Sequence, residues 1–265
     1  MSRTRGTWNT RGTWLAGAAL AAVLALTGYA VIRGGDGDSD TAGKGGSSPN
    51  VSSSPSAVPT YQVPDDWTEP DRWAALPRGA RTDKHGSEVG FPQSTEGALG
   101  MAAAANRINI ENGRSTVDEQ LRIYYSYVDK ADQSSNNAKL IEQQALQTDK
   151  NLAQQMSVKP GSPLPSGAYM RNTVIGYKVI KKSSDEVSVW LLARVTQKNG
   201  EMAKESSSYT RTLNAVVWED GDWKLSGAAT TRAQQDAAMQ TEPKIVAPGD
   251  EDFNDAGWTA IREAS

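Results

Sequence analysis

The sequence predicts an α+β fold in which a transmembrane helix is followed by helices packed on one face of an antiparallel sheet. Residues 14–32 are apolar and carry no charge. From residue 94 to residue 156, apolar side chains recur at intervals of three and four, which is typical of amphipathic helices. Beyond the Pro- and Gly-rich segment 160–165 the period changes to two, which is typical of strands. Helices followed by a run of strands indicate the α+β class.

Residues 14–32 are expected to form a single transmembrane helix that follows a cytoplasmic segment, residues 1–13. At about 1.5 Å per residue, this stretch nearly spans a hydrocarbon core of ~30 Å. Arg3, Arg5 and Arg11 precede it. Positively charged flanks stay in the cytoplasm, so the C-terminal bulk is expected outside the cell membrane. The alternative is a cleaved signal peptide, whose apolar region is usually only about 7–15 residues long.

Two segments of unlike composition connect this helix to the folded domain. Residues 33–60 consist mainly of Gly, Ser, Asp, Pro, Thr and Ala, which predicts a disordered linker. Residues 61–93 contain Trp67, Trp73 and Phe91 in an otherwise polar stretch, and we expect an extended arm that packs on the domain through these rings. The alternative is that the tryptophans form an exposed platform for a partner or a glycan.

The α+β domain is expected over residues 94–230. Its first helix begins at Ser94 or Thr95, includes Ile108 in its apolar stripe and stops at Asn112-Gly113. The second helix begins at Ser115, followed by acidic residues in its first turn, and the third covers about 137–155.

The strand region is predicted to be an antiparallel meander. In its second long strand, Val187, Val189 and Leu191 face one way and Trp190 and Leu192 face the other. Turn-forming residues separate the strands at 182–185, 199–200 and 220–221, and the last two pairs, Asn-Gly and Asp-Gly, favour hairpins. Residues 231–265 are polar and acidic, and we expect a loosely attached tail with Phe253 and Trp258 as its contacts.

Composition excludes several kinds of chemistry. The chain has no cysteine, which rules out disulfides, thiol nucleophiles and Cys-ligated zinc, and its one histidine, His85, lies in a polar loop. Four of the 28 basic residues lie in residues 1–33, which hold no acid, so the remaining 24 face all 31 acidic residues. This balance disfavours a nucleic-acid partner. We expect no metal and no cofactor.

No phosphate loop, nucleophile elbow or zinc-binding His-Glu-x-x-His motif is present in the sequence. Two pairs of acids, Glu111 with Asp118 and Asp185 with Glu186, could approach a common site as acid and base, but adjacent acids at a turn are usually solvated. We therefore predict that the protein is not an enzyme. A set of aromatic, arginine and amide side chains on the strands could line a pocket or an interface: Tyr177, Trp190, Arg194, Tyr209, Arg211 and Asn214.

The order of elements, and the ending Val216-Val217-Trp218-Glu219-Asp220-Gly221-Asp222-Trp223-Lys224-Leu225, resemble nuclear-transport-factor-2-like domains. The resemblance covers about residues 94–230 and implies a curved sheet that forms a cone with the helices. Together with the anchor and linker, the layout is similar to bitopic scaffold subunits of type IV secretion and conjugation systems of actinobacteria. Scaffold subunits have no catalytic motif, so the resemblance implies no site residues.

The leading hypothesis is a membrane-anchored scaffold or accessory protein of conjugative transfer or type IV-like secretion. Its expected partners are the lipid bilayer, other envelope proteins and further copies of itself. Confinement to a membrane favours such contacts by raising effective concentration. The alternative is an extracytoplasmic ligand-binding or sensory module that holds a small molecule or cell-wall fragment in a concave pocket. A third reading, a hydrolase or isomerase, would need a buried acid with a raised pKa.

Overall fold

A computed structural model describes residues 67–111 and 113–262 of the chain. The predicted cytoplasmic segment, transmembrane helix and linker, and the first part of the arm, lie outside these residues. Within the described ranges, no helix has the length and apolar character needed to cross a membrane.

Three helices precede the long strands, as predicted: α2 (Thr95–Ala105), α3 (Thr116–Tyr127) and α4 (Ser135–Gln155). Each begins at a serine whose hydroxyl accepts a hydrogen bond from a backbone N–H of the first turn. Ser115 forms a capping box with Asp118, since each side chain accepts a bond from the other residue's backbone N–H. Local capping chemistry therefore sets where the helices begin.

The first helix is shorter than the sequence predicts. It ends at Ala105, and Ile108–Ile110 forms the short strand β4, antiparallel to β5 (Ala168–Lys182). The prediction that Ile108 continues the helical stripe is wrong. The Asn106 side chain donates to the carbonyl of Ala102 at 2.7 Å and ends the helix, after which alternating isoleucines suit a strand.

The antiparallel meander is confirmed. It runs through β5, β6 (Glu186–Asn199), β7 (Ser206–Glu219) and β8 (Asp222–Leu225). The turn between β7 and β8 is the predicted Asp-Gly pair, and both residues have positive φ. The full sheet has the order β1-β9-β5-β6-β7-β8, with β4 also paired to β5.

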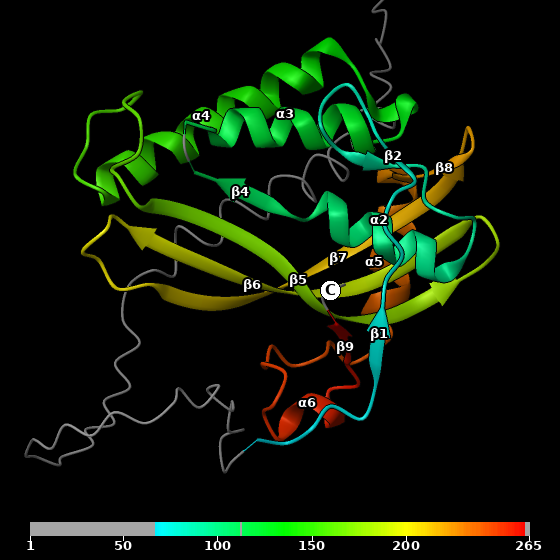
Figure 1. The fold of residues 1–265 in the computed structure, drawn as a ribbon. Helices are drawn as coiled ribbons and strands as arrows, with labels where there is room; N and C mark the ends of the chain where they lie inside the picture. Colours follow the sequence, from blue (N-terminus) through cyan, green and yellow to red (C-terminus); the bar gives the residue numbers. More distant parts are fainter. Residues whose placement is uncertain (1–66, 112, 263–265) are drawn as a thin grey trace, which may run out of the picture.

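Both faces of this sheet are covered (Figure 1). Helices α2, α3 and α4 lie over one face, which we call the inner face. Val187, Val189 and Leu191 of β6 point to it and join the main apolar core, whereas Trp190 and Leu192 join a second cluster on the opposite, outer face. The predicted alternation is therefore confirmed, and the side chains on each face are buried in a separate apolar cluster.

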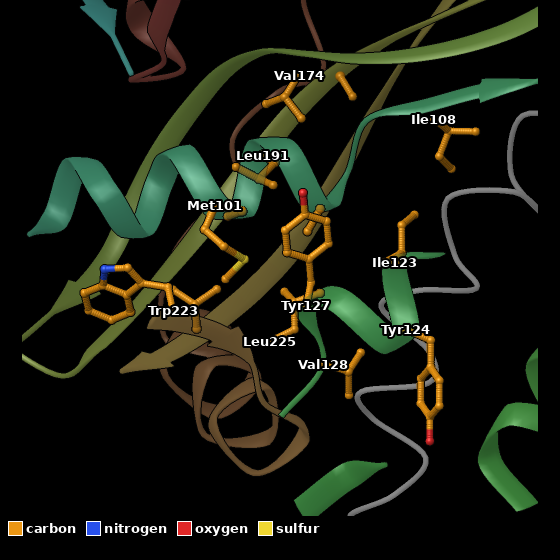
Figure 2. Close-up of a cluster of buried hydrophobic side chains, with 14 of the residues drawn as sticks. Met101, Ile108, Ile123, Tyr124, Tyr127, Val128, Val174, Leu191, Trp223 and Leu225 are labelled. Carbon is orange, nitrogen blue, oxygen red and sulfur yellow. The ribbon is translucent and has the colours of Figure 1, made fainter. Parts of the chain in front are cut away.

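Large side chains fill the space under the helices on the inner face (Figure 2). Met101 of α2, Tyr127 of α3 and Trp223 of β8 are at most 1% exposed. They pack with Leu191 and Val174 of the sheet in one continuous core. Burial of this many apolar and aromatic side chains is the main stabilising contribution to the domain.

The C-terminal segment is not loosely attached, which corrects the prediction. It contains helix α5 (Gly227–Ala238) on the outer face, the short helix α6 (Asp252–Asp255) and strand β9 (Thr259–Arg262). Phe253 and Trp258 are fully buried and serve as the contacts that the sequence suggested. The polar composition hid a strand that enters the sheet between the edge strand β1 (Trp73–Ala75) and β5.

The described part of the arm follows the sheet edge and then crosses to the helices. Strand β1 pairs in parallel with β9, and β2 (Arg81–Thr82) forms a small hairpin with β3 (Glu88–Val89). Phe91 is buried at 2% exposure, whereas Trp67 and Trp73 are half-buried. The arm is thus part of the fold.

Candidate functional site

A hollow with a volume of about 420 Å³ opens at the edge of the sheet beside α2. Three arginines line it, and we call it the arginine-rimmed hollow. Four separate parts of the chain build it: the arm, α2, β5 and β9 (Figure 1). Its walls consist of Leu76, Pro77, Arg78, Glu88, Phe91, Gly100, Ala103, Ala104, Arg107, Thr173, Val174, Ile261 and Arg262.

Helix α2 makes room for the hollow with a second stripe of small residues. Gly100, Ala103, Ala104 and Arg107 are spaced by three, one and three residues, so they share one side of the helix and its C-terminal continuation. A side chain at Gly100 would place its Cβ 2.5 Å from the carbonyl oxygen of Pro77. Glycine therefore allows the arm to pass close to the helix, and the alanines leave the space beyond it open.

A buried carboxylate holds the arm in place. Asp222, 4% exposed, accepts hydrogen bonds from the backbone N–H of Gly90 at 2.9 Å and of Phe91 at 3.0 Å. The indole N–H of Trp223 donates to the carbonyl of Pro92 at 2.9 Å. The first two residues of β8 thus attach the arm next to α2, and Phe91 forms part of the hollow's wall.

The third arginine comes from the C-terminal strand. Because β1 and β9 pair in parallel with Ala75 opposite Arg262, the arm and the chain's last described residue meet at the hollow. The Arg262 guanidinium lies over the ring of Trp73, 5.2 Å from its centroid, which is within reach of a cation–π contact. Trp67 and Trp73 both donate their indole N–H to Glu69, and these bonds lower the pKa of that carboxyl group.

The charged side chains of the hollow are mostly arginines. Its lining contains three arginines and one acid, Glu88, and Glu69 interacts electrostatically with one of the arginines, Arg262. The guanidinium of Arg107 has no hydrogen-bond or ion-pair partner within residues 67–111 and 113–262, although its backbone carbonyl accepts a bond from Arg122. Apolar side chains, among them Val174, Phe91 and Ile261, supply the rest of the surface. Such a combination suits a small ligand that has an anionic end and an apolar part.

The side chains proposed from the sequence as a pocket or interface lie on two different faces. Tyr177 packs against the inner core, and Asn214, 1% exposed, accepts a bond from the Asn106 side chain. The others follow the outer face of β6 and β7: Trp190, Arg194, Tyr209 and Arg211.

On the outer face, residues of the C-terminal segment bind the guanidinium of Arg211, which lies beside the second apolar cluster. The Arg211 guanidinium lies 5.1 Å from the Trp190 ring and binds Glu242 and the carbonyl of Pro243. Arg194 bonds the hydroxyl of Ser207. These four residues are neighbours, but none of them lines the arginine-rimmed hollow.

The acids considered as catalytic pairs have separate structural partners. Glu111 pairs with Arg171, whereas Asp118 belongs to the cap of α3. Asp185 lies in the turn before β6, and Glu186 pairs with Arg232 of α5.

The histidine is also accounted for by a local contact. His85 stacks on the ring of Tyr125 with a centroid distance of 5.4 Å. No group of three or more His, Cys, Asp or Glu side chains within the described ranges has the arrangement of a metal site.

Arg78, Arg107 and Arg262 are not among the site residues that the sequence predicts. One signal was available, because the small-residue spacing that ends at Arg107 marks a second face of α2. Nothing in the local sequence connects that face to Arg78 or to Arg262.

Fold and site together define a mixed α+β domain with an arginine-rimmed hollow where its two ends meet. A family model described as a domain of unknown function, DUF8175, matches residues 33–243, and the chain belongs to this family. The match covers the predicted linker and most of the folded domain, and it ends before β9. Searches of curated proteins and of solved structures found no match.

Proposed function

We propose that this protein is a non-enzymatic interaction protein, anchored in the cell membrane, with its domain outside. The observation that carries this proposal is the filled inner face. Met101, Tyr127 and Trp223 occupy the space between the helices and the sheet, where a catalytic cavity of a cone-shaped domain would lie. A packed interior suits a domain that works through its surface.

The engagement of the buried carboxylates also supports a non-enzymatic role. Glu119, 2% exposed, forms ion pairs with Arg114 at 3.0 Å and with Arg122 at 2.9 Å. Asp222 is bound by the arm, as described above. A general acid or base needs access to substrate and a proton to exchange, whereas carboxylates saturated by arginine or backbone N–H groups are suited to holding elements together.

For the finer architecture, we propose a nuclear-transport-factor-2-like cone. Helices before a long meander and a sheet that curves around them support it (Figure 1). A terminal hairpin with Asp220-Gly221 at its turn and Trp223 just after it also supports it. Pairing irregularities in β5 near Gly176 and Lys181 suit a bent strand.

The cellular role we propose is that of a scaffold or accessory subunit in conjugative transfer or type IV-like secretion. Its support is the layout: an arginine-flanked apolar segment at residues 14–32, a linker, and one compact domain. Tethering would concentrate the domain among other envelope proteins and further copies of itself.

The test is crosslinking of the full-length protein in its native membrane, followed by purification and mass spectrometry. Enrichment of a secretion ATPase or of channel subunits is expected. A matched control replaces residues 14–32 with an unrelated transmembrane segment, which keeps the location and removes contacts made by the native helix. No reproducible partner for the native protein would refute the scaffold role.

The arginine-rimmed hollow favours a second candidate, an extracytoplasmic ligand-binding or sensory module. Its volume of about 420 Å³ lies within the range of small-molecule sites, about 300–1,000 Å³. Three arginines beside apolar side chains in one concave site are a feature that ligand binding would use and that a scaffold surface does not need. A thermal-shift screen of the full-length protein against neutral and charged small molecules tests this role, and stabilisation that saturates with concentration is expected.

A further inference from the structure

We propose that residues 206–214 of strand β7, which we call the open edge, pair with the open edge of a second copy of this chain. The pairing is antiparallel and centred on Thr210, so it joins two sheets into one. This inference rests on the first proposed function and identifies one partner of the interaction protein. Three features carry it: unpaired backbone groups, the protection of the other sheet edges, and the match of the open edge to itself.

The open edge lacks a second strand. β7 pairs with β6 from Ser206 to Val217, but with β8 only from Val216 to Glu219. Within residues 67–111 and 113–262, no other strand pairs with residues 206–214. At about 3.4 Å per residue, this leaves roughly 30 Å of sheet edge that can accept another strand.

Every second residue of the open edge points its backbone N–H and C=O groups away from β6. The β6–β7 pairing has no register shift, so this alternation holds along the whole edge. The carbonyl of Ala215 accepts from the N–H of Ser226, on the side of β8. The same direction applies to the alternate residues before it: Ser207, Tyr209, Arg211 and Leu213. Their N–H and C=O groups have no backbone partner within the described ranges.

Helix α5 leaves the open edge accessible. It begins where β8 ends and crosses the outer face away from this edge. Along it, Arg232 pairs with Glu186 of β6, and Asp236 lies 3.6 Å from Lys181 of β5. The outward-pointing residues of the open edge are accordingly exposed or half-buried.

Other edges of the sheet are short or carry lysine. The strands β1, β4 and β8 have only three, three and four residues. Within the described ranges, residues 178–182 of β5 also lack a second strand, but they contain three lysines and a register shift between Val179 and Lys181. Short strands, lysines and bulges keep sheet edges from pairing. The open edge has no lysine, proline or acid, and its one charged side chain, Arg211, is bound by Glu242.

The open edge matches itself best in one register. Hydrogen-bonded pairs of an antiparallel ladder join residues whose backbone groups point at each other, so the outward-pointing residues must pair among themselves. A pairing centred on Thr210 uses all of them. It places Ser207 opposite Leu213 of the second copy, and Tyr209 opposite Arg211. A pairing centred on Arg211 would instead place two arginines opposite each other, which is unfavourable.

Backbone and side chains both gain in the register centred on Thr210. Four residues of each copy contribute one N–H and one C=O, which gives about eight backbone hydrogen bonds. Tyr209 lies beside Arg211 of the second copy on the outer face, and Ser208 lies opposite Thr212 on the inner face. The two-fold axis is perpendicular to the sheet, so both copies present the same face to one side. This symmetry suits two chains anchored in one bilayer.

Disulfide crosslinking in the native membrane tests this register, because the full-length chain has no cysteine of its own. Opposite residues of a non-hydrogen-bonded pair have Cα atoms about 4.5 Å apart, which a disulfide can bridge. Thr210→Cys should therefore form a homodimer under mild oxidation. Ser208→Cys and Thr212→Cys should each stay monomeric and should link only when the two variants are co-expressed, which decides the question even if Thr210→Cys does not fold.

Two cysteines outside the open edge measure random collision. Met202→Cys lies in the loop before β7, where Met202 is 98% exposed, and Lys182→Cys lies on the lysine-bearing edge of β5. We expect Thr210→Cys to give at least tenfold more dimer than either control.

A proline variant tests whether the outward backbone groups make the contact. Ser207→Pro removes an outward N–H at both ends of the two-fold pairing and should lower the dimer yield of Thr210→Cys at least threefold. Ser207→Ala removes the same hydroxyl but keeps the N–H, and it should leave the yield unchanged. Thermal unfolding of each variant after reduction confirms that it is folded.

The outcomes separate this inference from the scaffold role. If no register-specific dimer forms while envelope proteins are still captured, the inference is refuted and the scaffold role remains. A register-specific dimer without any other captured protein supports the inference and counts against a role among secretion subunits. Equal dimer yields for Thr210→Cys and Met202→Cys would indicate collision and refute the inference. A disulfide adduct of Thr210→Cys with a different protein would also refute it, because another chain would then occupy the open edge.

Discussion

Replacement of Asp222 by asparagine should weaken the attachment of the arm to the domain at Gly90 and Phe91. The Asp222 carboxylate is buried, and each of its two oxygens accepts a hydrogen bond from a different residue of the arm. Oδ2 accepts from the N–H of Gly90 at 2.9 Å and lies 3.4 Å from the Nζ of Lys224, whereas Oδ1 accepts from Phe91 and from the N–H of Trp223, both at 3.0 Å. Asparagine keeps the shape and one acceptor oxygen but turns an N–H group toward the other donors.

The magnitude follows from this geometry. A hydrogen bond to a charged group contributes about 1.5–3 kcal/mol, and an unsatisfied buried N–H costs about 1–3 kcal/mol. With the amide oxygen at the Oδ1 position, Asp222→Asn loses the bond to Gly90 and weakens those to Phe91 and Trp223. Because such contributions overlap, we expect the free energy of unfolding to fall by about 2–4 kcal/mol.

Urea denaturation of the full-length protein in neutral detergent, followed by tryptophan fluorescence, measures this change. Hydrogen exchange of the Gly90 and Phe91 amides should accelerate in the same variant. The matched control is Asp185→Asn, an exposed turn residue, which should change the free energy by less than about 0.5 kcal/mol. A loss below about 0.5 kcal/mol for Asp222→Asn, with slow exchange retained, would refute the anchoring argument.

Three further perturbations test other parts of the structure. Ser115→Ala removes the capping box of α3 and should cost about 1 kcal/mol in the same denaturation assay, whereas an unchanged midpoint would contradict that role. Gly100→Ala should destabilise the protein by about 1–3 kcal/mol, because its Cβ meets the arm, although alanine favours a helix by about 1 kcal/mol; a net gain in stability would show that the arm yields easily. For Glu69, the bonds from Trp67 and Trp73 lower the pKa of its carboxyl group, so their stabilising effect is present above the unfolded pKa and is lost as the pH falls through the folded pKa. In an acid titration by nuclear magnetic resonance, the two indole N–H signals should move together with a midpoint below the ordinary glutamate value, and Glu69→Gln should abolish this step.

The sequence by itself determined the elements whose signals are local. Ser94 and Ser115 cap helices through backbone N–H groups three residues away, and Asp220-Gly221 accepts the positive φ of a tight turn. The alternation in β6 also needs no knowledge of the partner strands. For these features the energy that selects the conformation comes from neighbours in the chain, so pattern and capping rules were sufficient.

Errors arose where the deciding contact was distant in sequence. The end of α2 is set partly by Asn106, whose side chain also donates to Asn214 on β7. The C-terminal strand has an unremarkable polar composition, and its place in the sheet depends on pairing with β1, almost 190 residues earlier. Local composition indicated a loose tail because it carries no information on which edge is available for pairing.

The arginine-rimmed hollow belongs entirely to the second category. The sequence contains the spacing that ends at Arg107, but only the parallel pairing of β1 with β9 brings Arg262 to it, and only the bonds from Asp222 place the arm nearby. The side chains proposed from the sequence were instead selected by strand alternation, which says which residues share a face and not which face stays open. A concave site forms where the packed elements leave a space that no side chain fills. Which space stays unfilled depends on how all the elements pack together.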